Sequence, residues 1–367
     1  MDSVFVKDIS LPTLILDETK CKRNISRIFS KVSAIGIDFR PHFKTHQSKY
    51  IGKWFWDLGI RKITVSSLRM AKYFLQSGWN DILIAFPTNL RELDEYLLYA
   101  NQISLKITIS DVAAIEFLAK VLTFPNEIYL EVDVWSMRSG FDIHNLNEID
   151  RALKIISKSK FIKLVGILAH NSDVYNCRSP EEVCESNKKF LSKLFDLKNY
   201  LVMKGYNIQL SIGDTPSVSI CEDFTGVDEL RPGNFVFYDV MQVAIGSCSV
   251  DDIAVCLAVP IVAIYPQRNE IVCYGGAIHL SKDYIKIEEM DIFGLVVDIQ
   301  ENTWTNPIEE TFVKSLYKEH SVIKTTPEFI SQHRVGDLLG ILPIHSCLTA
   351  EAMKKYLIPN LAWADHL

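Results

Sequence analysis

The feature that most constrains this chain is a regular alternation of two kinds of segment between about residues 20 and 245. Short runs of β-branched and other apolar residues are typical of buried parallel strands, and longer amphipathic segments lie between them. The strand-like runs include RKITVSS, DILIAFP, KITIS, IYLEVDV, KLVGILAH and IQLSIGD. Repeated strand–helix units of this length favour a parallel sheet with crossover helices.

The number of these units predicts a closed barrel. Seven or eight strand–helix units follow one another in the region, and a (β/α)8 TIM barrel typically needs about 250 residues. A doubly wound open sheet is the competing α/β fold, but no GxGxxG follows the first strand. We therefore predict a (β/α)8 barrel over residues 16–245.

The pattern changes after about residue 245. Short strand-like runs such as NEIVCYGG, IFGLVVDIQ and VGDLLGILPIH are separated by turn residues, and long helical patterns are absent. The chain has 367 residues, which is long for a single core. We predict a second, mainly β domain over residues 246–367. A strand within residues 1–15, carrying SVFVKD, could join it.

Composition excludes several classes of partner. Apolar residues make up 48% and charged residues 23%, the net charge is −6, and no Lys/Arg stripe suits nucleic acid. No apolar run approaches the ~18 residues of a membrane span, and no signal-peptide pattern is evident. The eight cysteines are scattered without a CxxC pair, which is typical of reduced thiols. We expect a cytoplasmic protein that binds neither nucleic acid nor membrane.

Residues suited to chemistry follow several of the predicted strands. Lys44 lies in RPHFKTH, at the end of the first barrel strand. Others, in chain order, are Arg138, His170, Tyr175, Gly213, Thr215, Gly233, Asn234 and Tyr238. Because barrel strands end at one face, we expect these residues to line one site. The glycines and hydroxyls near the last strands would suit a phosphate group.

Each of these residues also has an ordinary structural explanation. Asp214 or Thr215 followed by Pro216 is a common helix start, without any ligand. Taken alone, His170 is most often a core histidine, Arg138 a surface ion-pair partner and Tyr175 a packing residue. These alternatives stay open on the residues alone.

A possible pair of metal ligands lies near the end of the sequence. In His345-Ser346-Cys347 the residues alternate as a strand would, which would place the imidazole and the thiol on one face. Both groups are good Zn²⁺ ligands. Two neighbouring ligand types do not by themselves define a metal site.

The ensemble of motifs resembles the fold-type III pyridoxal-phosphate (PLP) enzymes, whose barrel is like that of alanine racemase. Within them it is similar to the D-threonine aldolase and D-serine dehydratase group. The resemblance covers nearly the whole chain in the expected order. It is carried by LPTLILDETKCKRNI, RPHFKTH, DILIAFP, residues 133–140, GILAHNSDVY, GDTPSV, ELRPGNFVFYD and LLGILPIHSCLT.

The resemblance implies roles for the candidate residues. Lys44 would bind PLP covalently, Arg138 would contact its phenolic oxygen, and His170 would lie beside its ring. Tyr175 would be a catalytic residue of the substrate pocket. The residues implied to cradle the phosphate are Gly213, Thr215, Gly233, Asn234 and Tyr238. His345 and Cys347 would bind a divalent metal, implied to be Zn²⁺, in the His-x-Cys form of the dehydratases.

Neighbours of Lys44 could tune its amine. If RPHFKTH is extended, His42 and His46 share the strand face of Lys44 and could order it or bind the phenolic oxygen. Arg40, if it faces the site, would favour the neutral amine. Asp214 departs from expectation, because a carboxylate beside a phosphate is repelled unless it points away.

Three functions follow from the resemblance. The first is a metal-assisted PLP lyase that acts on D-3-hydroxy amino acids, as a dehydratase or an aldolase. The second is an amino-acid racemase in which Tyr175, or a residue of a second subunit, is the opposite base. The third is a non-catalytic PLP-binding protein. A homodimer acting on a small amino acid is implied by the resemblance alone.

Overall fold

The computed structural model describes residues 8–287, 289–301, 303–359 and 362–367. The chain divides into two compact units. The barrel unit consists of Ile28–Lys44 and Phe55–Gly233, and the sheet unit of the described parts of Met1–Arg27, Thr45–Trp54 and Asn234–Leu367. Lys44 and Thr45 are consecutive in the chain but belong to different units.

The barrel unit contains a parallel sheet in the order β2-β10-β9-β8-β6-β5-β4-β3. A parallel bridge between His42 and Thr64 joins the two ends of this order, so the ring of strands is nearly closed. This confirms the predicted (β/α)8 barrel. Its strands are β2 (Asp38–Phe39), β3 (Lys62–Val65), β4 (Asp81–Pro87), β5 (Ser104–Ile109), β6 (Asn126–Asp133), β8 (Ile162–Ala169), β9 (Gln209–Ile212) and β10 (Glu229–Leu230), with β7 (Phe141–Asp142) beside β6.

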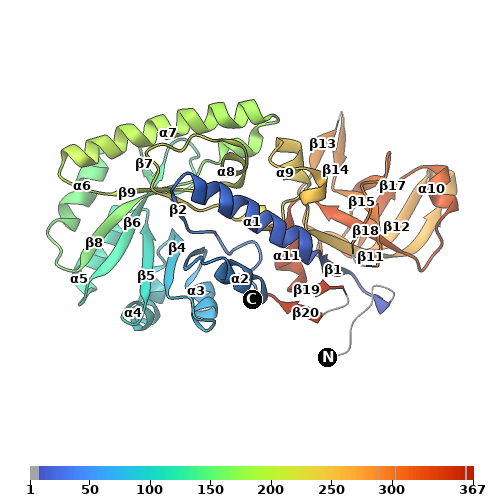
Figure 1. Cartoon of the computed structure of the whole chain (residues 1–367), viewed down its shortest axis with the longest axis horizontal. Coiled ribbons are helices and arrows are strands. Elements are labelled where there is room, and N and C mark those ends of the chain that lie inside the picture. The colour runs from blue at the N-terminus through green and yellow to red at the C-terminus, as the bar shows by residue number, and fades with distance from the viewer. Residues whose placement is uncertain (1–7, 288, 302, 360–361) are drawn as a thin grey trace. The chain divides into compact units, whose positions relative to one another are not determined.

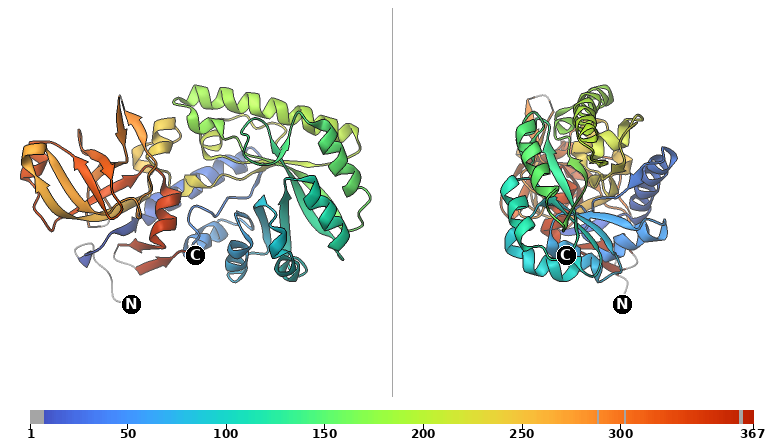
Figure 2. Two further views of the ribbon diagram at one scale, coloured as in Figure 1. Left: turned by 180° about the vertical axis from the view of Figure 1, so that it is seen from behind. Right: turned by 90° about the vertical axis from the view of Figure 1, so that its left-hand side faces the viewer.

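Helices alternate with the barrel strands along the chain (Figures 1 and 2). They are α1 (Glu18–Ala34), α2 (Lys49–Asp57), α3 (Leu68–Leu75), η2 (Leu90–Glu92), α4 (Leu93–Ala100), α5 (Val112–Val121), α6 (Leu146–Ile156), η3 (Asp173–Asn176), α7 (Pro180–Met203) and α8 (Thr215–Ile220). Local signals begin several of them: Ser67, Asp111 and Ser179 accept backbone N–H bonds as N-caps. In the described part of the chain, every helix is too short or too polar to cross a lipid bilayer.

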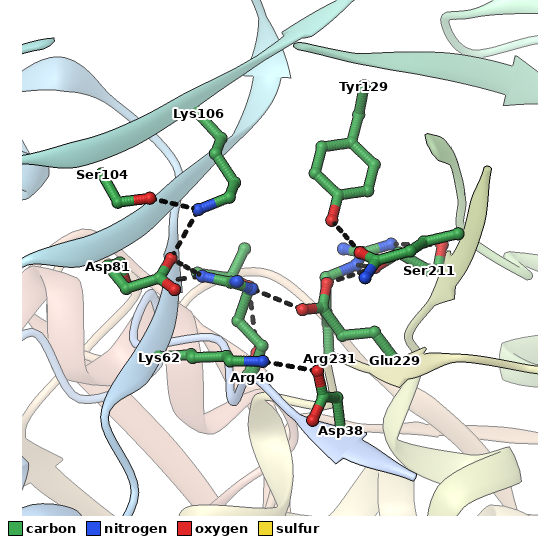
Figure 3. A network of polar contacts seen from close by, with 12 residues as sticks. Asp38, Arg40, Lys62, Asp81, Ser104, Lys106, Tyr129, Ser211, Glu229 and Arg231 are labelled. Atoms are coloured by element: carbon green, nitrogen blue, oxygen red, sulfur yellow. Dashed lines mark hydrogen bonds and ion pairs between the residues drawn. The ribbon is translucent and has the colours of Figure 1, made fainter. Parts of the chain in front are cut away.

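A network of charged side chains links strands of the barrel unit (Figure 3). Arg40 lies between two carboxylates: its Nε is 2.6 Å from Glu229 Oε2, and its Nη1 is 2.7 Å from Asp81 Oδ1. Lys106 Nζ adds a second cation 2.8 Å from Asp81. Burial opposes the charge on Arg40, yet the two carboxylates raise its pKa. Arg40 is therefore committed to this network, and the expectation that it tunes Lys44 directly is not supported.

The sheet unit contains a sheet in the order β12-β17-β16-β15-β18-β11-β1-β19-β20, with a further pairing of β12 and β11. Its strands are β1 (Thr13–Leu16), β11 (Val255–Tyr265), β12 (Glu270–Tyr274), β15 (Gly294–Asp298), β16 (Phe312–Leu316), β17 (His320–Lys324), β18 (Leu338–Pro343), β19 (Lys355–Ile358) and β20 (Ala362–Asp365), and β13 (Ile285–Ile287) pairs with β14 (Met290–Ile292). Its helices are η4 (Asn234–Val236), α9 (Val240–Ile245), η5 (Val250–Asp252), η6 (Pro266–Arg268), α10 (Pro327–Ser331) and α11 (Ser346–Met353).

The sheet unit confirms a mainly β carboxyl-terminal region. Its pairings are antiparallel except that β1 and β19 run parallel. Val259 and Ile261 of β11 belong to one buried apolar cluster and Ala258 to another, so both faces of this strand are covered. The expected strand SVFVKD lies almost entirely outside the described residues, whereas Thr13–Leu16 pairs with β11.

Candidate active site

Lys44 lies in a turn that follows β2 and the bridge at His42. Residues 43–46 form this turn, so the extended conformation that would align His42 and His46 with Lys44 is absent. The side chain of Lys44 is exposed, but Phe43 beside it is fully buried. The Phe43 ring lies 4.9 Å from the Phe55 ring and 5.1 Å from the Trp79 ring. This packing anchors the backbone that carries the lysine.

Two imidazoles lie within electrostatic reach of Lys44. His42 is buried, and its Nδ1 accepts the N–H of Lys44 at 3.3 Å. Burial lowers the pKa of His42, and the charge of Lys44 lowers it further. Burial and Lys44 also lower the pKa of His170 to about 3, although His170 Nδ1 bonds to the Gly213 carbonyl. Both rings are therefore neutral at pH 7.

Two further predicted residues surround these rings. Tyr175 lies in η3, and its ring is 5.9 Å from that of His170. Arg138 is exposed in the loop after β6, and its charge contributes to the lowered pKa of both His42 and His170. The barrel unit therefore gathers the predicted lysine, arginine, tyrosine and two histidines from loops that follow β2, β6 and β8.

The loop after β9 has the properties of an anion cradle. Among the described residues, the buried hydroxyls Thr215 Oγ1 and Ser217 Oγ have no hydrogen-bond partner. A Cβ on Gly213 would lie 2.6 Å from the Arg231 carbonyl oxygen, so only glycine fits there. Unpaired buried hydroxyls are costly, and an oxygen-rich ligand such as phosphate would satisfy them. The barrel unit thus fits the phosphate of PLP.

Asp214 does not point into that cradle. Its Oδ1 accepts the Ser217 N–H at 2.6 Å and caps α8, as the ordinary helix-start explanation predicts. Burial raises the pKa of Asp214 to about 6, which Arg231 and Ser217 partly offset. The carboxylate is turned to the helix, and this removes the objection that it would repel a phosphate.

The sequence reasoning missed Arg231. This arginine follows β10, is 5% exposed, and donates from Nε to Ser211 Oγ at 2.7 Å. Its Nη2 donates to the Ala169 carbonyl at 3.0 Å. Burial lowers the pKa of Arg231 to about 10, against the raising effect of Glu229. The signal that could have found it is its place in ELRPGNFVFYD, two residues before the predicted site residue Gly233.

In the sheet unit, His345 and Cys347 stand at the start of a helix. The predicted strand alternation is wrong, because β18 ends at Pro343 and His345 is the N-cap of α11. His345 Nδ1 is 2.7 Å from Asp283 Oδ2. Burial opposes the charge on His345, but Asp283 and Cys347 raise its pKa to about 11.

Asn234, a residue of the predicted phosphate set, holds this helix start together with Asp239. Asp239 is buried, and its Oδ2 accepts the Ser346 N–H at 3.0 Å and the amide of Asn234 at 2.7 Å. Asn234 Nδ2 also lies 3.0 Å from Ser346 Oγ. Asn234 therefore supports the residue between His345 and Cys347. Tyr238 is fully buried, has φ 48°, and lies 5.5 Å from the Arg27 guanidinium.

One contact relates the His345–Cys347 pair to the lysine. Thr45 Oγ1 lies 3.2 Å from Cys347 Sγ, and Thr45 is joined to Lys44 by a peptide bond. The amide Nδ2 of Asn234 lies 3.5 Å from the same sulfur. Two candidate ligands and two potential donors to a thiolate thus lie beside the residue that follows Lys44. In the described part of the chain, no three His, Cys, Asp or Glu side chains form a complete metal site.

Two regions of the chain match known protein families. Residues 16–240 match the family described as "Alanine racemase, N-terminal domain", and residues 254–359 match the "Putative serine dehydratase domain". The first match covers more than half of the sequence and coincides with the barrel strands. The chain belongs to the alanine racemase N-terminal domain family.

The chain is similar to two dehydratases along almost its whole length. It is 27% identical to a D-serine dehydratase of Dictyostelium discoideum, covering 97% of this chain and 94% of that one. It is 25% identical to the D-threo-3-hydroxyaspartate dehydratase of Delftia sp., covering 95% and 93%. The solved structure of the Delftia enzyme has a TM-score of 0.91 at 23% identity, covering 100% and 99%. A cysteine-to-alanine variant of a D-threo-3-hydroxyaspartate dehydratase, solved in a metal-free form, gives the same TM-score, identity and coverage.

Proposed function

We propose that the chain is a PLP-dependent lyase that dehydrates D-3-hydroxy amino acids with the help of a divalent metal. The observation that carries the proposal is the 3.2 Å contact between Thr45, the neighbour of Lys44, and Cys347. A barrel lysine alone would serve any PLP reaction of this fold. A His-x-Cys pair beside the residue that follows that lysine in the chain supports a reaction that also needs an electrophile at the substrate.

The barrel unit supplies the residues that would hold PLP. Lys44 would bind its aldehyde, and Arg138 would face the phenolic oxygen. Neutral His42 and His170 would lie near the ring without adding charge. The unpaired hydroxyls of Thr215 and Ser217 support phosphate binding there, with Gly213 and Gly233 as the remaining candidates in this unit. When bound, PLP supplies an electron sink for the charge left on the substrate Cα.

The sheet unit supplies the residues that would hold the metal. His345 Nδ1–H donates to Asp283, which leaves Nε2 of the ring for a cation. Thr45 and Asn234 lie within 3.5 Å of Cys347 Sγ and would stabilise it as a thiolate ligand. We propose Zn²⁺, because this imidazole and thiolate pair suits its ligand preference. When bound, the metal is a Lewis acid for the substrate β-oxygen.

The residues of this chain then have separate tasks. The amine of Lys44, once the substrate amine has displaced it from the cofactor, would accept the Cα proton of the D-amino acid. Tyr175, 5.9 Å from His170, would orient the substrate in the pocket. The β-hydroxyl would leave as water, and the net products from D-serine would be pyruvate and ammonia. A homodimeric assembly and a cytoplasmic location also remain proposals.

The test is incubation with D-serine, D-threo-3-hydroxyaspartate, D-threonine and their enantiomers, with and without a chelator. We expect keto acid and ammonia from the D-hydroxy acids, loss of turnover with chelator, and recovery on adding Zn²⁺. Glycine and acetaldehyde from D-threonine would instead identify an aldolase. Exchange of enantiomers unaffected by chelator would overturn the proposal in favour of a racemase. Lys44→Ala should abolish both turnover and the visible absorbance of the bound cofactor.

A further inference from the structure

Helix α2 begins five residues after Lys44, and a residue of strand β20 accepts hydrogen bonds from the first N–H groups of this helix. Asp365 Oδ1 accepts the Ser48 hydroxyl at 2.8 Å and the Tyr50 N–H at 3.2 Å, and Oδ2 accepts the Lys49 N–H at 3.1 Å. Ser48 Oγ in turn accepts the Ile51 N–H at 3.2 Å. The first N–H groups of a helix have no partner within it, so Asp365 completes a cap that Ser48 alone cannot provide.

The residues between Lys44 and this helix are held from the same region of the sheet unit. The Tyr356 hydroxyl donates to the His46 carbonyl at 2.7 Å, and the Leu367 N–H donates to the Gln47 carbonyl at 2.9 Å. Gln47 has φ 41°, a left-handed conformation that a residue with a side chain rarely adopts. Such a conformation persists only where the surrounding structure imposes it.

The Gln47 side chain has its own partner in α11. Its Nε2 donates to Glu351 Oε2 at 2.7 Å. With Thr45 against Cys347, every residue from 45 to 50 has a contact with the segment 347–367. Each residue of the segment that follows Lys44 is therefore held by a part of the chain that lies about three hundred positions later in the sequence.

We propose that Asp365 is a positioning residue for Lys44. By capping α2 it fixes where the helix starts, and the strained turn at Gln47 transmits that position to the lysine three residues earlier. Asp365 acts through Ser48 and the backbone of residues 45–50, not on substrate. The inference rests on the proposed function, because it assigns Lys44 as the reactive amine.

The experiment compares Asp365→Asn with a matched cap elsewhere. Asp111 caps α5 in the barrel unit, where its Oδ1 accepts the Ala113 N–H at 2.6 Å, so Asp111→Asn makes the same chemical change far along the chain from Lys44. Asp365→Glu keeps the carboxylate and should restore part of the effect. If Asp365→Asn folds poorly, Ser48→Ala removes the bond to Asp365 and the bond from Ile51, and serves as the second variant.

Three quantities are measured on each full-length protein loaded with PLP. They are the amide hydrogen exchange of residues 45–50, the pH titration of the visible absorbance of the Lys44-bound cofactor, and kcat per bound PLP. For Asp365→Asn we expect faster exchange, a shifted titration and a kcat lower by about 10- to 100-fold, since a misplacement of about 1 Å can cost about 100-fold. KM should change less. Asp111→Asn should keep kcat within about twofold at a similar loss of Tm.

The outcomes separate this inference from the proposed function. If Asp365→Asn lowers Tm but leaves exchange at residues 45–50, the titration and kcat per bound PLP unchanged, Asp365 is only structural and the inference is wrong. If the two Asn variants lose kcat equally, the inference is also wrong. A wild-type protein that protects residues 45–50 and binds PLP at Lys44, but turns over no D-3-hydroxy amino acid, would overturn the proposed function alone.

Discussion

Replacing Arg40 by methionine should destabilise the barrel unit strongly. The Arg40 side chain is 2% exposed, and its guanidinium bridges Glu229 at 2.6 Å and Asp81 at 2.7 Å (Figure 3). Methionine fills similar volume without charge, so the variant tests electrostatics and not a cavity. Glu229 would keep its hydrogen bond from Ser211 and the charge of Arg231 but lose the guanidinium that contacts it, whereas Asp81 would keep Lys106 at 2.8 Å.

The expected loss follows from the burial of Glu229. Removing one partner of a buried ion pair typically costs about 3–5 kcal/mol, because the other charge is left without compensation. For a domain of 150–250 residues this corresponds to a fall in Tm of about 6–20 °C. A double variant, Arg40→Met with Glu229→Leu, should regain most of the stability.

Urea unfolding followed by circular dichroism at pH 7.5 measures these effects. Arg151→Met is the matched control, since Arg151 pairs with Glu116 at 2.5 Å with 64% and 39% of their side chains exposed. An exposed pair contributes at most about 1 kcal/mol, so the control should differ little from wild type. The reasoning is refuted if Arg40→Met loses no more stability than Arg151→Met, or if the double variant regains none of the lost stability.

Three further predictions concern the candidate site. Thr215→Val should leave the cofactor-free chain equally or more stable, because the hydroxyl has no partner among the described residues, but weaken PLP binding about 10- to 100-fold in a fluorescence titration. Gly213→Ala should cost about 1–3 kcal/mol in urea unfolding, because its Cβ would meet the Arg231 carbonyl at 2.6 Å. Asp283→Asn should lower zinc affinity about 10- to 100-fold in a chelator competition, since Asp283 orients His345; an unchanged affinity would contradict that role.

Local pattern carried much of the fold. The alternation of apolar strands and amphipathic helices identified the barrel, because both periodicities are visible within about ten residues of sequence. The punctuated strands after residue 245 identified the mainly β region for the same reason. The start of α8 at Asp214 and Pro216 could also be predicted, since an N-cap acts on residues two or three positions away.

The residues of the candidate site could be predicted from the sequence, but their arrangement in space could not. His345 and Cys347 were expected on a strand, yet α11 begins between them, because three residues cannot distinguish a strand end from a helix start. Arg40 was expected near the amine of Lys44, but Glu229 and Asp81 bind it. Arg231 was not among the predicted site residues, since its neighbours in the sequence do not indicate that an arginine is buried.

The sequence by itself determined the barrel, the mainly β region and the position of Lys44 at the end of a barrel strand. Only the tertiary structure decided which groups meet: Thr45 with Cys347, and Asp365 with the helix that follows Lys44. Propensity and hydrophobic periodicity are properties of neighbouring residues. Hydrogen bonds and ion pairs depend on distances of about 3 Å in space, which the order of residues does not record.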